Sequence, residues 1–245
     1  MEATIAEQRR SIGTTAVIAA VGAVAFVVAS VWYGLAVRGV TVPVEPVFTG
    51  EETFGERFRI FFGWVVLTLP QERLYVSIAI VGFACLGVVT ILAMRAVATD
   101  QSLSRAGTFG VVLGSSLWIV GNVLQLGAHR AVGSMATHGN PLPTVGAIFF
   151  TADTIDDAFE TGAFAALGVG MLVLASATFR ADARAWGRYT GVLGVLSLIL
   201  VAAYVGEQGD VVNVLLLGLG VVVLPVWLVW TATRFSSPAA DGRLS

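Results

Sequence analysis

The residues with the clearest chemical potential in this 245-residue sequence are four closely spaced carboxylates. They lie in residues 151–160 and are Asp153, Asp156, Asp157 and Glu160. On a helix, at about 100° per residue, they would share an arc of about 100° over two turns. Carboxylates this close cannot all be ionised without a compensating cation, such as Arg130 or a bound ion. The pattern could therefore bind a cation or carry a proton.

A second polar pattern precedes the acids and ends at a histidine. With the same helical period, five residues fall within an arc of about 80°: Ser115, Trp118, Asn122, Gln125 and His129. Polar groups are costly in hydrocarbon, so this stripe must face protein or water. Asn122, Gln125 and His129 are therefore candidate ligand-binding residues, together with the four acids. Alternatively, Asn122 and Gln125 only link helices through hydrogen bonds, worth about 0.6 kcal/mol each on average.

The two histidines of the chain, His129 and His138, raise a metal hypothesis. With a carboxylate such as Asp157, two imidazoles could hold a divalent transition metal and leave one position for water. The spacing matches no ligand motif such as H-E-x-x-H. Both histidines could in principle ligate a haem, although His138 lies among Gly and Pro residues rather than on a facing helix. A divalent metal is thus a candidate cofactor.

The acidic run also has a purely structural interpretation. Residues 161–179 are long enough to span a membrane, so residues 153–160 could be a solvated first turn of the helix. Acidic side chains there would complement the positive end of the helix dipole, with Thr151 or Asp153 as the N-cap. A cavity that joins His129 to residues 153–160 would instead favour a site.

The composition indicates that these residues belong to a membrane protein. The chain is 56% hydrophobic and 12% charged, with a mean hydropathy of +0.85, whereas soluble domains are about 25% charged. A helix needs about 20 apolar residues to cross about 30 Å of hydrocarbon, and open strands would leave unpaired backbone groups in lipid. Six stretches are long enough: residues 12–37, 74–96, 106–128, 161–179, 189–205 and 211–233.

We therefore predict an all-α fold, a polytopic bundle of six transmembrane helices. Residues 1–234 form a single domain and residues 235–245 a short cytoplasmic tail. The first apolar run is too long for the core of a cleaved signal, which has about 7–15 residues, so we expect it to be the first span.

The loop at residues 38–73 contains a shorter apolar run. Its ten residues, 60–69, cannot cross a membrane and end at Pro70. Aromatic and charged residues alternate from Phe54 onward, which favours a helix over about residues 54–69 that lies in the membrane interface or is re-entrant.

The arginines give the bundle a direction. The termini and the connections on their side hold nine of the fourteen arginines, and the other side holds five. By the positive-inside rule both termini are cytoplasmic, in a bacterial-type plasma membrane. Eleven of the sixteen acids then lie on the outer side, where the polar stripe also ends.

Several classes of function are excluded by composition. A net charge of −2 provides no basic surface for nucleic acid. A single cysteine, Cys85, allows neither an intrachain disulfide nor a cysteine metal cage. The absence of lysine excludes a retinal Schiff base.

Three functions remain after these exclusions. The first is binding or transport of a cation, proton or small polar ligand through an outward-facing pocket of histidine and carboxylates. The alternatives are a membrane-embedded, metal-dependent enzyme and a non-catalytic accessory or assembly subunit. The expected partners are the lipid bilayer, a small ligand or ion, and a second membrane protein or another copy of the chain.

Overall fold

The computed structural model describes residues 2–236 apart from 42, 45, 48, 98–100 and 179–183. The described residues are almost all helical and contain no strand. In chain order the elements are α1 (Glu2–Val37), α2 (Phe54–Val97), α3 (Gln101–Thr137), α4 (Leu142–Thr178), α5 (Arg184–Val205), α6 (Gly209–Gly218), the π-helical segment η1 (Leu219–Val223) and α7 (Leu224–Ser236). The last three form one continuous span.

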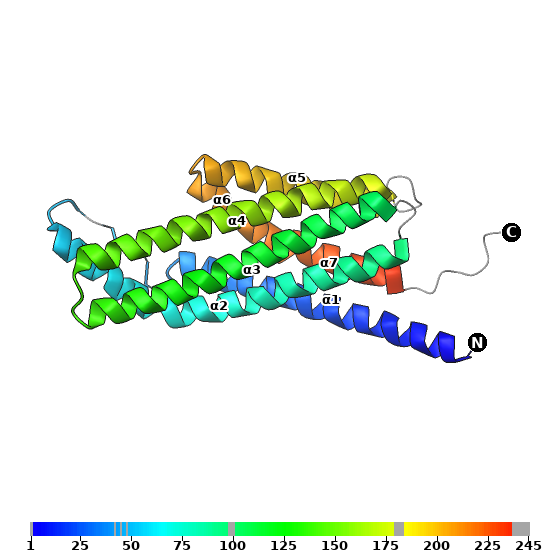
Figure 1. Ribbon diagram of the computed structural model, residues 1–245, viewed down its shortest axis with the longest axis horizontal. Helices are drawn as coiled ribbons and strands as arrows, with labels where there is room; N and C mark the ends of the chain where they lie inside the picture. Colours follow the sequence, from blue (N-terminus) through cyan, green and yellow to red (C-terminus); the bar gives the residue numbers. More distant parts are fainter. Residues whose placement is uncertain are drawn as a thin grey trace.

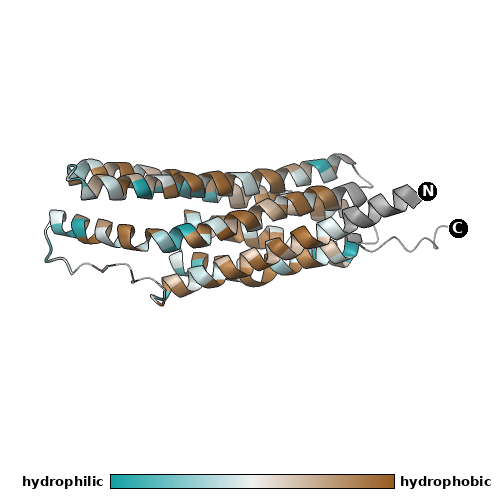
Figure 2. Cartoon of the chain, turned by 90° about the horizontal axis from the view of Figure 1, so that it is seen from below, coloured by the Kyte–Doolittle hydropathy of each residue, from teal (hydrophilic) through white to brown (hydrophobic). Residues whose placement is uncertain are grey.

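The helices pack side by side into an elongated bundle (Figure 1). Six of them are long and apolar enough to cross a membrane, which confirms the predicted fold class. The start of α1 and the end of α7 lie together at one end of the bundle (Figure 1), and we call the opposite end the distal end. Figure 2 shows hydrophobic residues over most of the bundle and hydrophilic patches within its distal half.

Three helices extend beyond the others at the distal end (Figure 1). The helices α2, α3 and α4 have 44, 37 and 37 residues, whereas α5 has 22. At 1.5 Å per residue the longest reaches about 66 Å, twice what a bilayer core requires. This extension has a hydrophobic core of its own, formed by Phe62, Val65, Val132, Val145 and Phe149.

Residues 54–69 are helical as predicted, but they do not form a separate interfacial or re-entrant helix. They are the first part of α2, which continues through Pro70. Proline removes one helical hydrogen bond and usually ends or kinks a helix. Here aromatic residues pack on another helix, since Phe58 lies against Gly146 of α4 and the ring of Phe62 is 5.7 Å from that of Phe149, also on α4. That packing makes the extension favourable despite the proline.

The pair α3 and α4 is packed at backbone contact. A Cβ atom added to Gly110 would lie 2.7 Å from Cα of Gly170, and one added to Gly114 would lie 2.6 Å from the carbonyl oxygen of Ala163. Only small residues allow helices to approach this closely. The contact fixes the rotation of both helices, so that the stripe of α3 faces the acids of α4.

A widened turn interrupts the last span beside the bundle centre. In η1 the N–H of Leu224 donates to the carbonyl of Leu219, five residues back. The segment ends just before Pro225, which has no N–H to donate. Such π-helical turns often occur at functional sites, and this one lies on the wall of the cavity described next.

Candidate functional site

A cavity of about 320 Å³ lies inside the distal half of the bundle. Every helix and the segment η1 contribute to its wall. Its lining includes eight polar or acidic side chains that matter for the argument: Tyr33, Tyr75, Asn122, Gln125, Asp156, Asp157, Glu160 and Tyr204. The cavity thus joins the polar stripe of α3 to the acidic run of α4. The two patterns singled out in the sequence face one another.

The acids of α4 are not the first turn of their helix. α4 begins at Leu142, about three turns before Asp153. Thr151 does not cap the helix either, because its hydroxyl donates to the carbonyl of Ala147 within it, at 2.8 Å. The interpretation of the acidic run as a capped helix start is therefore wrong. The carboxylates project from the middle of a long helix.

Glu160 joins three helices through hydrogen bonds. The hydroxyl of Tyr204, on α5, donates to Oε2 of Glu160 at 2.5 Å. The amide of Asn122, on α3, donates to Oε1 at 3.4 Å. That amide also donates to the carbonyl of Trp118 at 3.1 Å. Both oxygens of Glu160 are therefore engaged.

Asp156 is in a different position. It is 5% exposed, and its Oδ1 is buried without a hydrogen-bond partner. Room for this atom comes from Gly121 of α3, where an added Cβ would lie 3.0 Å from Oδ1. A buried carboxylate without a compensating donor or cation is costly. Binding of a proton or of a nearby cation would therefore stabilise Asp156.

The remaining lining residues give the cavity a rim and a floor. Asp157 lines the cavity and is itself exposed on the surface of the bundle. Toward the bundle centre the lining is aromatic, with Phe26, Phe83, Trp118 and Phe164. The rings of Phe83 and Trp118 are stacked, 4.3 Å apart and 18° from parallel.

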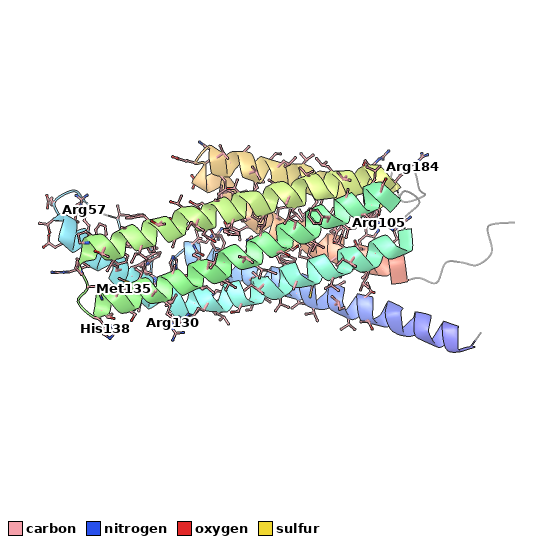
Figure 3. All side chains as sticks on the ribbon, in the orientation of Figure 1. Arg57, Arg105, Arg130, Met135, His138 and Arg184 are labelled. Carbon is pink, nitrogen blue, oxygen red and sulfur yellow. The ribbon has the colours of Figure 1, made fainter. Side chains whose placement is uncertain are left out.

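Two arginines of α3 show how far the carboxylates of the cavity lie from the ends of the spanning part of this helix. Arg105 and Arg130 are at opposite ends of the spanning part of α3 (Figure 3). Their separation of 25 residues corresponds to about 38 Å of helix, close to the thickness of a bilayer. Asn122, which bonds to Glu160, is eight residues inside Arg130, or about 12 Å. Glu160 therefore lies between the levels of Arg105 and Arg130, where α3 is mostly apolar.

His129 lies beyond the cavity and has an acidic partner that the sequence analysis missed. Its Nδ1 is 2.9 Å from the carboxylate of Glu72, on α2. Its ring stacks on Phe149 of α4, with centroids 5.2 Å apart, and its Nε2 is buried without a partner. Glu72 lies in the short polar stretch at residues 70–73, inside the predicted loop at residues 38–73, so nothing in its sequence context marks it as a buried partner of His129.

The structure does not bring together His129, His138 and Asp157. His138 is exposed at the distal tip (Figure 3), where its Nδ1 lies 2.7 Å from the carbonyl oxygen of Ser134. Within the described ranges, no three His, Cys, Asp or Glu residues are placed to hold a metal ion. Asp153 is partly buried on α4, but it is outside the described lining of the cavity.

Three tyrosines also line the cavity, namely Tyr33, Tyr75 and Tyr204. Tyr33 of α1 donates to Oδ1 of Asn213 at 2.7 Å, and its ring packs against that of Tyr75, 5.8 Å away. A single tyrosine inside an apolar span is a weak signal, because tyrosine is also common where it only packs.

Comparison with known proteins adds no relative to these observations. No protein-family model, no curated protein and no solved structure matches this chain.

Proposed function

We propose that this membrane protein binds or transports a small cation, and that the cavity lined by all the helices is its binding site. One observation carries the proposal: Asp156, Asp157 and Glu160 line a single cavity inside a bundle of apolar helices, and none of its described lining residues is basic. Three carboxylates without a basic partner attract positive charge. The unpartnered Oδ1 of Asp156 supports the same conclusion.

The protein is further proposed to reside in a bacterial-type plasma membrane with both termini in the cytoplasm. The excess of arginine on the side of the termini supports this direction. The cavity, in the distal half, would then be accessible from the outer side. A metal-dependent enzyme receives less support, because the described residues offer no cluster of metal ligands.

The proposal can be tested by thermal unfolding of the purified protein in detergent. Sodium, potassium, calcium, ammonium and 2-phenylethylammonium chlorides are added in turn at equal ionic strength. A ligand that binds only the folded state stabilises it by about 2.7 kcal/mol at one hundred times its dissociation constant. We expect at least one of these cations to raise the unfolding midpoint.

A pair of double variants makes the test specific. Asp156→Asn with Asp157→Asn removes two carboxylates from the cavity, and the cation-dependent rise should disappear. Asp153→Asn with Asp210→Asn removes two acids outside the described lining, and the rise should remain. The proposal is wrong if no cation stabilises the wild type, or if both double variants respond as the wild type does.

A further inference from the structure

We propose that the cation is organic, an ammonium group joined to a flat apolar body. This inference rests on the proposed function and adds the class of ligand to it. Two features of the cavity carry it, namely its size and the arrangement of acidic and aromatic residues in its wall.

The size of the cavity suits a small molecule. Its volume is about 320 Å³, and binding sites for small molecules measure about 300–1,000 Å³. An ion such as calcium needs six to eight oxygen ligands at about 2.3–2.6 Å. In the part of the chain that the structure describes, no three acidic, histidine or cysteine groups are placed that way. An inorganic ion would leave most of the space unfilled.

The acidic wall can hold one ammonium group. An ammonium donates hydrogen bonds and accepts none, as the side chain of lysine shows. Asp156 lines the cavity with a carboxylate whose buried Oδ1 lies beside Gly121 without a donor, and Asp157 adds a second carboxylate at the rim. Glu160 is already bonded to Tyr204 and Asn122. The ammonium group therefore belongs beside Asp156 and Asp157.

The floor of the cavity can hold the apolar body. Trp118 and Phe83 form one stacked pair, and Phe164 and Tyr204 form another, 19° from parallel. Aromatic faces attract cations within about 6 Å of the ring centre and pack against other flat rings. Because these rings lie on the bundle-centre side of the acids, the ligand would enter with its apolar end first.

Calorimetric titration of the purified full-length protein separates the components of this ligand. The probes are 2-phenylethylamine, its neutral analogue 2-phenylethanol, methylamine, sodium chloride and calcium chloride. We expect 2-phenylethylamine to bind at least ten-fold more tightly than each of the others. The variant Trp118→Leu should weaken that binding about ten-fold, whereas Trp64→Leu, outside the described lining, should leave it unchanged.

The other outcomes distinguish this inference from the proposed function. If methylamine, sodium or calcium binds as tightly as 2-phenylethylamine, the apolar body is irrelevant and the inference is overturned, while cation binding stands. If 2-phenylethanol binds as tightly, or if nothing binds, the inference is overturned, and the proposed function falls with it when no cation raises the unfolding midpoint. The comparison among probes uses the wild type, so it remains decisive even if Trp118→Leu does not fold.

Discussion

Glu160 illustrates how single residues define the cavity, because its carboxylate binds side chains from two other helices. Tyr204 and Asn122 donate to its two oxygens, whereas Asp156, one turn away, has an oxygen without any donor. Hydrogen bonds to a charged group contribute about 1.5–3 kcal/mol each. Glu160 therefore serves mainly to hold the wall in place, and Asp156 is the residue left to interact with a ligand.

The bond between Tyr204 and Glu160 can be tested by a double-mutant cycle. Tyr204→Phe and Glu160→Gln, alone and together, should show a coupling free energy of about 0.5–3 kcal/mol in unfolding experiments. As a control, Tyr189→Phe replaces Tyr204→Phe, because Tyr189 donates instead to the carbonyl of Val223. That pair should be additive within about 0.5 kcal/mol. Equal coupling in both cycles would contradict the assigned bond.

The loop before α2 offers a pH-dependent prediction. Hydrogen bonds from the N–H of Glu52 itself, from the N–H and hydroxyl of Thr49 and from the N–H of Gly50 lower the pKa of the Glu52 carboxyl from 4.5 to about 2. A lowered pKa stabilises the folded loop at pH values above 4.5, and this stabilisation is lost as the pH falls toward 2. Carboxyl NMR titration should show Glu52 ionised at pH 3.5, and an ordinary midpoint near 4.5 would refute the arrangement.

At the scale of the helices, the spans could be predicted from sequence but their ends could not. Apolar length revealed all six spans, because hydrocarbon requires it. The same criterion placed the end of the third span near Ala128 and the start of the fourth at Thr161, whereas α3 continues to Thr137 and α4 begins at Leu142. Hydropathy predicts which turns of a helix contact lipid. The additional turns of α3 and α4 pack against α2, so hydropathy did not reveal them.

The candidate site was predictable only in part, for a related reason. The helical period predicted that Asn122 lies in the polar stripe of α3 and that the acids share one face of α4, because each face depends on the sequence of one helix alone. The bond from Tyr204 depends on where α5 lies, and the pairing of Glu72 with His129 depends on α2 continuing past Pro70. Neither is encoded in a local pattern.

The close packing of α3 on α4 leads to a matched pair of glycine variants. Gly110→Ala would place a Cβ 2.7 Å from the backbone of Gly170, whereas a Cβ on Gly127 of the same helix meets nothing within 4 Å. We expect Gly110→Ala to destabilise the protein by about 1–3 kcal/mol. Gly127→Ala should be neutral or stabilise it by up to about 1 kcal/mol. Unfolding measurements with the same effect for both variants would contradict the packing.

At the scale of the whole molecule, the bundle has two unlike ends. The described ends of the chain lie at one end and the helical extension at the other, and the cavity lies between them. The proposed orientation exposes the extension to the outside. The helix α3 runs from the end of the bundle that holds the described chain ends to the distal end. Labelling its two ends therefore tests the orientation of the whole bundle.

The orientation predicts which end of α3 reacts with a membrane-impermeant maleimide in intact bacterial cells. In a Cys85→Ser background, His138→Cys should be labelled from outside, because His138 is exposed at the distal tip. Ser102→Cys, exposed at the other end of α3, should be labelled only after the cells are permeabilised. The reverse pattern would show that the termini face outward.

The central claim is that a cation contacts the carboxylates of α4. Infrared difference spectroscopy measures this most directly, because carboxylate stretching bands shift when a cation binds. Spectra are recorded with and without 2-phenylethylamine, and in parallel with sodium and calcium chloride. We predict a carboxylate difference signal for at least one of these cations, present in Asp153→Asn and absent when Asp156→Asn and Asp157→Asn are combined. A spectrum without carboxylate bands for every cation, or one unchanged in the combined variant, would contradict the account.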